Sequence, residues 1–306
     1  MTDPGVIELE SFKLARFIEQ VPCYICGEGN TSHAELCRNC FAPMALTHQA
    51  RSQGVSPQMV ACLGATGAGK TVYLGMLMDI LSRNQRTLQL LARGAFSISL
   101  QQSTMAALAR CEFPNKTPGE PDRWHWVHCQ VAMMARKQKL ELVLPDLAGE
   151  ALMEELDHPN AFPVLRSLLT HCAGVTVLID AQRIEEGEGD QEFFTMKLLS
   201  YLAELSAESP ISWQKRPVAL IFSKADLTEN CFDDPLAYAE RHLPGLIAHC
   251  RERFSKFRFF AAGVAGAVGY RRRGGARILY PLRIEPRGIV EPFLWLMEQI
   301  HVAKRS

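Results

Sequence analysis

The octapeptide GATGAGKT at residues 64–71 constrains the fold of this chain more than any other segment. It matches G-x4-G-K-[ST], a pattern whose glycines let successive backbone N–H groups turn toward phosphate oxygens. The apolar run 59–63 before it predicts a buried strand, and apolar residues at helical spacing follow it over residues 72–81. A strand, a glycine loop and a helix in this order predict an α/β sheet. Phosphate is then expected at the carboxyl end of the strand, against the helix N-terminus.

The loop assigns roles to individual residues. The Lys70 ammonium would neutralise the β- and γ-phosphates, and the Thr71 hydroxyl would bind Mg²⁺. The predicted phosphate-contacting residues are Gly64, Ala65, Thr66, Gly67, Ala68, Gly69, Lys70, Thr71 and Val72.

A second strand-like run, 140–144, ends in the sequence PDLAGE at residues 145–150. Asp146 at the end of a buried strand suits Mg²⁺ binding through water, and the spacing D-x-x-G places the Gly149 amide where a γ-phosphate would lie. The spacing is common in turns, so it gains meaning from its position after a phosphate loop and a strand.

Two further strand ends bear on the choice of nucleotide. The run 217–222 ends in Ser223-Lys224-Ala225-Asp226, where the Asp226 carboxylate can accept two hydrogen bonds from guanine N–H donors. The Lys224 stem can lie across the base. Adenine lacks that donor pair and would leave the carboxylate unpaired. The strand-like run 256–262 follows, and a backbone amide at Ala261 or Ala262 is expected to meet guanine O6. A solvated turn and a plain strand end are the alternatives for these two segments.

Four of the ten cysteines, Cys23, Cys26, Cys37 and Cys40, form the pattern C-x2-C-x10-C-x2-C. Each C-x2-C pair lets a tight turn aim two sulfurs at one centre, and two pairs complete a tetrahedral thiolate site. Such a site suits Zn²⁺ and leaves no position for a catalytic water. Four unligated cysteines, or His33 replacing one of them, are the alternatives. We expect the other six cysteines to be small buried side chains.

Taken in order, the segments from about residue 59 to residue 300 resemble the Ras-like P-loop GTPases of the TRAFAC class. By that resemblance residues 146–149 are the second switch, residues 223–226 read the base, and residues 261–263 form the last base-side loop. The cysteine segment resembles the short zinc ribbons that open many bacterial multidomain proteins. It differs from the Ran-binding-protein type of zinc finger, because Val21 stands at the position of the expected tryptophan. A ribbon followed by such a domain is similar to the bacterial double-GTPase families, which are linked to biological-conflict systems.

The resemblance implies a first-switch threonine between the first helix and Asp146. We select Thr117, in the turn-rich loop 113–119, over Thr104 in a helical pattern and Thr87 at the start of an apolar run. Glu150 stands where Ras-like members carry the glutamine that orients the attacking water. Ser223 and Ala261 also depart from the family pattern, which has Asn or Thr at the first position and Ser or Cys at the second.

Lys and Arg number 33, as do Asp and Glu, so the net charge is zero. This balance argues against binding nucleic acid or membranes through overall charge, and leaves only a local patch such as residues 271–273. The first ten residues show no secretory signal, and apolar runs such as 175–179 are too short to span a bilayer. We therefore expect a cytoplasmic protein whose partner is a protein, bound through the ribbon or the switch loops. The glycine-rich segment 263–281 is expected to be a mobile loop with a basic tip. The alternative is a contact with phosphate or nucleic acid, or a loop near the base.

These patterns predict a zinc ribbon (1–48), a linker (49–58) and a Ras-like α/β domain (59–306) with a mainly parallel sheet and helices on both faces. The expected function is a switch that binds GTP or GDP and hydrolyses GTP with Mg²⁺, in a bacterial conflict or regulatory system. Lys70, Gly149 and Glu150 are its expected catalytic residues. The alternatives are an ATP-using P-loop NTPase, for which Asp226 would be incidental, and a nucleotide-binding adaptor that does not hydrolyse.

Overall fold

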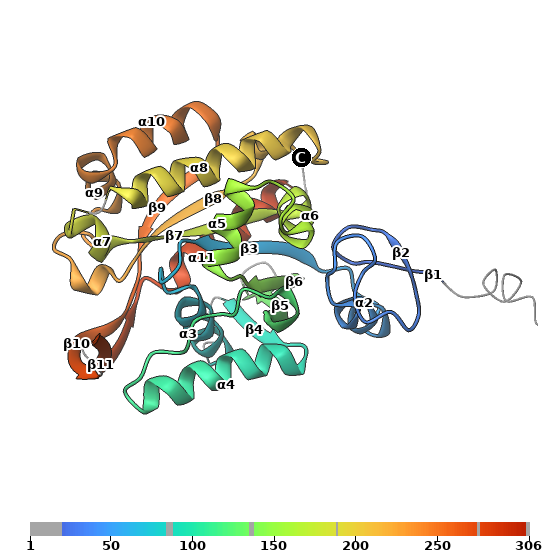
Figure 1. The fold of residues 1–306 in the computed structure, drawn as a ribbon, viewed down its shortest axis with the longest axis horizontal. Coiled ribbons are helices and arrows are strands. Elements are labelled where there is room, and N and C mark those ends of the chain that lie inside the picture. The colour runs from blue at the N-terminus through green and yellow to red at the C-terminus, as the bar shows by residue number, and fades with distance from the viewer. Residues whose placement is uncertain (1–19, 84–87, 135–137, 188, 274–275, 304–306) are drawn as a thin grey trace, which may run out of the picture.

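The computed structural model describes residues 20–83, 88–134, 138–187, 189–273 and 276–303. Its centre is a seven-stranded sheet with the order β4-β5-β6-β3-β7-β8-β9 (Figure 1). Strand β5 is antiparallel to both of its neighbours, and the remaining pairs are parallel. The strands are β3 (Gln58–Gly64), β4 (Leu88–Ala92), β5 (His125–Met133), β6 (Gln138–Asp146), β7 (Gly174–Asp180), β8 (Val218–Ser223) and β9 (Phe257–Ala261).

The central strands form where the sequence has unbroken apolar runs. Every residue of β7 and β8 is buried, as is β3 from its second residue onward. Continuous burial is typical of parallel strands that are covered on both faces. The predicted mainly parallel α/β sheet is confirmed.

Helices cover both faces of the sheet (Figure 1). Their apolar side chains fall into two buried clusters, one on each face. One face carries α3 (Lys70–Arg83), α4 (Ala95–Ala109) and α11 (Val290–Ala303); the other carries α5 (Gly149–Asp157), α6 (Pro163–His171), α8 (Asp190–Glu204), α9 (Pro235–His242) and α10 (Pro244–Arg253). The short helix α7 (Ala181–Glu185) and the 3-10 turns η1 (Pro121–Arg123), η3 (Leu205–Ala207), η4 (Trp213–Lys215) and η5 (Ala225–Leu227) complete the connections. No helix in these described ranges has the length and apolar content that crossing a bilayer requires.

The cysteine segment forms a small module at one end of the sheet (Figure 1). It contains the antiparallel pair β1 (Gln20–Pro22) and β2 (Gly29–Thr31), followed by α2 (Met44–Ser52). Its apolar residues share one buried cluster with Trp124 of the sheet domain. The Tyr24 hydroxyl donates to the Pro57 carbonyl, and the Gln49 side chain donates to the Arg93 carbonyl. The module is therefore packed against the sheet domain, and α2 continues into the segment 49–58 that we interpreted as a linker.

The expectation of a mobile loop at residues 263–281 is wrong. Strands β10 (Gly263–Arg273) and β11 (Ala276–Arg287) pair in an antiparallel hairpin that projects from the sheet, at the end away from the cysteine module (Figure 1). Glycine content suggested a loop, but one of these glycines makes room for a cross-strand ring. A Cβ on Gly269 would lie 2.9 Å from the Tyr280 ring. Ladder pairing with β11, which periodicity in β10 alone does not reveal, outweighs the weak strand propensity of glycine.

The cysteines outside the module follow the prediction with one exception. Cys62, Cys129, Cys172, Cys231 and Cys250 are buried, whereas Cys111 is exposed. Cys111 follows the end of α4 with a positive φ of 56°, so it lies in a turn where the chain leaves the helix.

Candidate functional site

A cavity of about 270 Å³ lies where the loops after β3, β6, β8 and β9 meet. The loop containing Thr117 and the hairpin complete its walls. Of the residues proposed from sequence, Thr66, Gly67, Ala68, Gly69, Lys70, Thr71, Val72, Thr117, Gly149, Glu150, Ser223, Lys224, Asp226 and Ala262 line it. Gly64, Ala65, Asp146 and Ala261 do not line it.

The phosphate loop has the backbone that its glycines predict. Gly67 and Gly69 have φ values of 82° and 84°, in the left-handed region that favours glycine. Helix α3 begins at Lys70, so its N-terminus faces the loop. The Lys70 Nζ donates to the carbonyls of Gly64 at 2.8 Å and Ala65 at 3.1 Å. Burial lowers the pKa of this ammonium, so a nearby anion would stabilise its charged form.

Two threonines and one aspartate meet beside the phosphate loop. The Thr71 and Thr117 hydroxyls each donate to the Asp146 Oδ2 at 2.9 Å. The other carboxylate oxygen of Asp146 is buried and has no hydrogen-bond partner in the described part of the chain. Burial raises the pKa of Asp146, and the bonds from Thr117 and Thr71 oppose that shift. Hydroxyl and carboxylate oxygens are ligands that Mg²⁺ prefers, so this set fits that ion.

Gly149 packs directly on the phosphate loop. It is the first residue of α5, and a Cβ at this position would lie 2.6 Å from the Thr66 nitrogen. Glu150 lines the cavity with its side chain 68% exposed, and its Oε1 lies 3.8 Å from the Lys116 Nζ. This ion pair joins the start of α5 to the loop that carries Thr117.

The loop 223–226, predicted to read the base, is fixed to strand β7. The Ser223 hydroxyl donates to the Ile179 carbonyl at 3.2 Å, a stabilising contact that serine can make in place of the usual Asn or Thr. Lys224 has a positive φ of 54° and donates through Nζ to the Asp180 carboxylate. The loop is therefore held by side-chain bonds at two consecutive residues.

Asp226 lines the cavity next to Gly263, at the end where the sequence predicts the base. Its Oδ1 is buried and has no hydrogen-bond partner among the described residues. Burial raises the pKa of Asp226, and backbone amides, including those of Asp226 and Ala265, partly oppose the shift. A Cβ on Gly263 would lie 2.2 Å from the same Oδ1, so glycine is required beside the carboxylate. A buried acceptor without a donor is what a guanine edge would complete.

The predicted amide contact to guanine O6 is not free in this structure. The Ala262 N–H donates to the Phe222 carbonyl at 2.8 Å, and the Ala262 carbonyl accepts from Ala225 N–H at 3.1 Å. Ala261 belongs to β9 and lies outside the cavity lining. The O6 contact thus remains a prediction that requires rearrangement at Ala262 or a different amide.

Sequence reasoning missed Asp180, a buried residue that links the loop 223–226 to the start of α7, close to the phosphate loop. Besides Lys224, its carboxylate accepts from the backbone N–H groups of Gln182 and Arg183 at the start of α7. The Arg183 Nη2 is 3.6 Å from the place that a Cβ on Gly67 would occupy. Asp180 ends an apolar strand just as Asp146 does, and this strand-end signal was available in the sequence.

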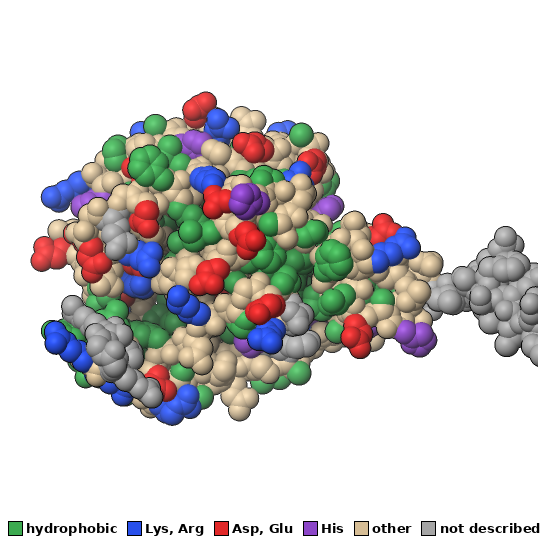
Figure 2. Space-filling view, in the orientation of Figure 1, with side chains coloured by type: hydrophobic (Ala, Val, Ile, Leu, Met, Phe, Trp, Pro, Cys, Tyr) green, Lys and Arg blue, Asp and Glu red, His purple; other side chains and the backbone are tan. Residues whose placement is uncertain are grey.

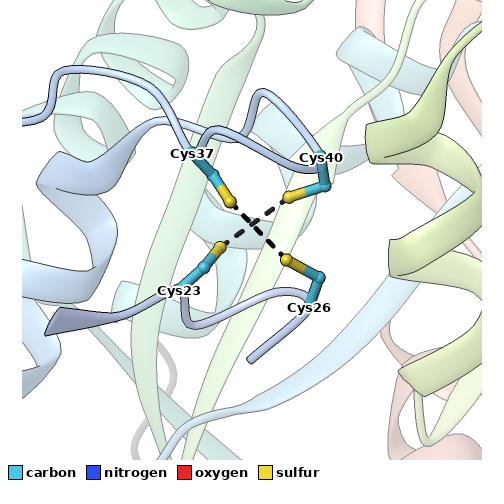
Figure 3. A group of neighbouring side chains, drawn as sticks. All are labelled: Cys23, Cys26, Cys37 and Cys40. Carbon is cyan, nitrogen blue, oxygen red and sulfur yellow. Dashed lines mark hydrogen bonds between the residues drawn. The ribbon is translucent and has the colours of Figure 1, made fainter. Parts of the chain in front are cut away.

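The four cysteines of the small module converge on one point (Figure 3). The sulfurs of Cys23 and Cys40 are 3.7 Å apart, and those of Cys26 and Cys37 are 3.6 Å apart. These distances are far longer than a disulfide, and they fit the edges of a tetrahedron with Zn–S bonds of about 2.3 Å. Backbone N–H groups of Ile25 and Asn39 each lie 3.4 Å from a cysteine sulfur. The hydrogen bond between Cys23 and Cys40 lowers the pKa of the Cys23 thiol and raises that of Cys40. The geometry fits a zinc ribbon.

Comparisons with known proteins bear on the same region. The family model described as Double-GTPase 2 matches residues 58–265, from β3 into β10. No protein with a curated description matches the chain.

Three solved structures are similar to it at low identity. A protein from Plasmodium falciparum titled as nucleolar GTP-binding protein 1 is 12% identical, with a TM-score of 0.42, over 81% of this chain and 89% of that one. Roco2 RocCORdC of Methanosarcina barkeri, bound to GDP, is 12% identical with a TM-score of 0.33, over 80% of this chain and 49% of its own. The bacterial selenocysteine-specific elongation factor EF-Sec is 14% identical with a TM-score of 0.33, over 67% of this chain and 25% of its own.

Proposed function

The chain belongs to the Double-GTPase 2 family of GTP-binding proteins, and we propose that it is a Mg²⁺-dependent switch that hydrolyses GTP. The observation that carries this proposal is the meeting of Thr71, Thr117 and Asp146 beside the phosphate loop. These residues come from three separate segments. An ion and a γ-phosphate bound at this point would hold the three segments together.

In the proposed mechanism Lys70 leaves the carbonyls of its own loop and neutralises charge on the β- and γ-phosphates. Thr71 and Thr117 would hold Mg²⁺ with help from Asp146, and the ion would supply further neutralisation of phosphate charge. The Gly149 N–H would donate to the γ-phosphate. Glu150 would orient the attacking water and accept its proton, while Lys116 offsets the repulsion between this carboxylate and the phosphate.

The switch follows from the same contacts. The loops that carry Thr117 and Gly149 touch each other through Lys116 and Glu150. Both loops would be ordered by a γ-phosphate and released when it leaves, as in other switches of this type. A protein partner that recognises one arrangement of these loops would then read the state of the nucleotide.

We assign the remaining parts of the chain within this proposal. Residues 20–48, the described part of the predicted module 1–48, would form a zinc ribbon, in which the metal stabilises the fold and the exposed face meets a protein partner. Residues 1–19 of that prediction lie outside the described residues. Residues 59–306 would be the GTPase domain. A regulatory or conflict system is the context that the family resemblance implies.

Competition binding and phosphate release test the proposal. The protein should bind labelled GTP with Mg²⁺, and excess ATP should displace it poorly. Phosphate release should require Lys70 and persist in Lys197→Ala, a matched loss of an exposed lysine that pairs with Asp157 outside the site. Equal displacement by ATP and GTP would favour the ATP-using alternative. If the wild-type protein binds GTP but releases phosphate no faster than Lys70→Ala does, the result would favour a nucleotide-binding adaptor that does not hydrolyse GTP.

A further inference from the structure

The β10–β11 hairpin begins and ends at the nucleotide site. Its first residue, Gly263, packs against the Asp226 carboxylate. Just beyond its last strand, the Ile289 carbonyl accepts from the Tyr73 hydroxyl at 3.0 Å, and Tyr73 belongs to the helix that follows the phosphate loop. Ile289 itself is buried and lines the cavity. The base of the hairpin is thus fixed at two places on the cavity rim.

One face of the hairpin turns toward the cavity. Val268 pairs with Pro281, and Tyr270 pairs with Leu279 across the ladder. Because strand residues two apart share a face, Val268 and Leu279 lie on the same face, and both line the cavity. Leu279 is 37% exposed, an open apolar surface at the edge of a cavity. In the space-filling view, hydrophobic side chains line the hollow beside the hairpin (Figure 2).

The far part of the hairpin reaches toward the first switch. The Arg271 Nη2 lies 3.7 Å from the Glu112 Oε1, and Glu112 directly precedes the cavity-lining residue Phe113. The hairpin therefore extends along the cavity from Asp226 to the loop that carries Thr117.

We propose that the hairpin is a wall of the nucleotide site, in which Val268 and Leu279 pack against the guanosine part of the bound nucleotide. This inference rests on the proposed function. The hairpin starts beside Asp226, on the predicted base side of the cavity, and Val268 and Leu279 are apolar. They therefore suit the base with its ribose and not the charged phosphates. A base offers flat apolar faces, and burying Val268 and Leu279 against it removes apolar surface from water. The pair thereby adds affinity for nucleoside without selecting between GTP and GDP.

The experiment compares fluorescent GDP and GTP binding by the full-length protein and by Val268→Ala, Leu279→Ala and the double variant. Loss of both side chains should raise the Kd for GDP and for GTP alike by about tenfold, mainly through faster release. The matched control is Leu282→Ala, which truncates a 57% exposed leucine of the same strand that does not line the cavity. Inorganic triphosphate, which has no base, serves as the second probe.

The outcomes separate clearly. A loss of nucleotide affinity in the Val268 and Leu279 variants, with triphosphate affinity and Leu282→Ala unchanged, supports the wall. Unchanged nucleotide binding in the double variant overturns it, as does an equal loss of triphosphate binding or an equal effect of Leu282→Ala. If the wild-type protein fails to bind GTP while folded, the proposed function fails and not the hairpin inference alone.

Discussion

The hydroxyl oxygens of Thr71 and Thr117 lie 3.0 Å apart, although 46 positions separate the two residues in the sequence. Both donate to the same oxygen of Asp146, at the end of a third segment. Thr71 is fixed by the first turn of α3, whereas Thr117 lies in an irregular loop. The contact therefore depends on the position of the loop. In the proposed switch it would be the point where nucleotide state changes the shape of the protein.

Thr117→Ala should weaken binding of GTP with Mg²⁺ by about tenfold, while GDP binding changes little. The reason is that one oxygen contact is removed from the γ-phosphate side of the site, and a hydrogen bond or ligand of this kind contributes about 1.4 kcal/mol. Titration with fluorescent GTP and GDP at fixed Mg²⁺ measures the difference. Ser99→Ala, which removes an exposed hydroxyl of α4, is the control. Equal losses for the two nucleotides would argue against a switch role for Thr117.

Gly149→Ala should lower the rate of GTP hydrolysis by about a hundredfold. A Cβ there would lie within 2.6–2.8 Å of backbone atoms of Thr66 and Ala65, so the phosphate loop or α5 must move. A displacement of about 1 Å can cost that factor in rate. Single-turnover phosphate release measures it. Gly189→Ala introduces the same methyl where nothing lies within 4 Å, so it should hydrolyse GTP normally. A normal rate in Gly149→Ala would remove the second switch from the mechanism.

Asp226→Ala should reduce the preference for GTP over ATP by tenfold or more. The carboxylate is half-buried, one of its oxygens has no partner among the described residues, and only guanine offers it two donors. An unpaired buried acceptor costs about 1–3 kcal/mol. Competition between labelled GTP and unlabelled ATP gives the ratio for both proteins. An unchanged ratio would mean that another residue selects the base.

The pH dependence of GTP binding provides a separate test of Asp226. Burial raises the pKa of this carboxyl above its usual range. The ionised form accepts the base, so affinity should be complete above the raised pKa and should be lost as pH falls through it. The loss should begin at a higher pH than for an exposed aspartate, and it should be smaller in Asp226→Ala, which retains only the contribution of groups such as Asp146. An identical pH profile for the two proteins would refute this assignment.

Local patterns in the sequence were sufficient to predict the sheet, the phosphate loop and the cysteine cluster. Buried parallel strands are continuous apolar runs, and paired C-x2-C knuckles and a glycine loop act over a few residues. The meeting of Thr117 with Asp146 follows from the family resemblance, which implies a threonine near Mg²⁺, and from the turn-rich loop that favours Thr117 over Thr87 and Thr104.

Features that depend on pairing between distant segments could not be predicted from the sequence. The sequence of residues 263–281 favours a loop, because its glycines hide the alternation that is typical of a strand. The need for glycine becomes clear only when the partner strand is in place. The position of Asp180 at the end of an apolar strand can be read from the sequence, but its bond to Lys224, 44 positions further on, cannot. The packing of the cysteine module on the sheet domain depends on side-chain bonds, such as those from Gln49 to Arg93 and from Tyr24 to Pro57, and on shared burial. No residue spacing in the sequence reveals these contacts.

Cys37→Ser should abolish zinc binding and lower the thermal stability of the whole chain, not of the module alone. The sulfurs of Cys26 and Cys37 are 3.6 Å apart in a closed set of four, so three remaining thiolates leave an open and weaker site. Because the module shares a buried cluster with the sheet domain, its unfolding would expose apolar surface on that domain as well. The zinc content measured by metal analysis should fall from one ion per chain toward none, and the midpoint of thermal unfolding should be several degrees lower. Cys111→Ser changes an exposed cysteine outside the cluster and should keep both values. Full zinc content in Cys37→Ser would refute the ribbon, and lost zinc with an unchanged midpoint would show that the module folds independently of the GTPase domain.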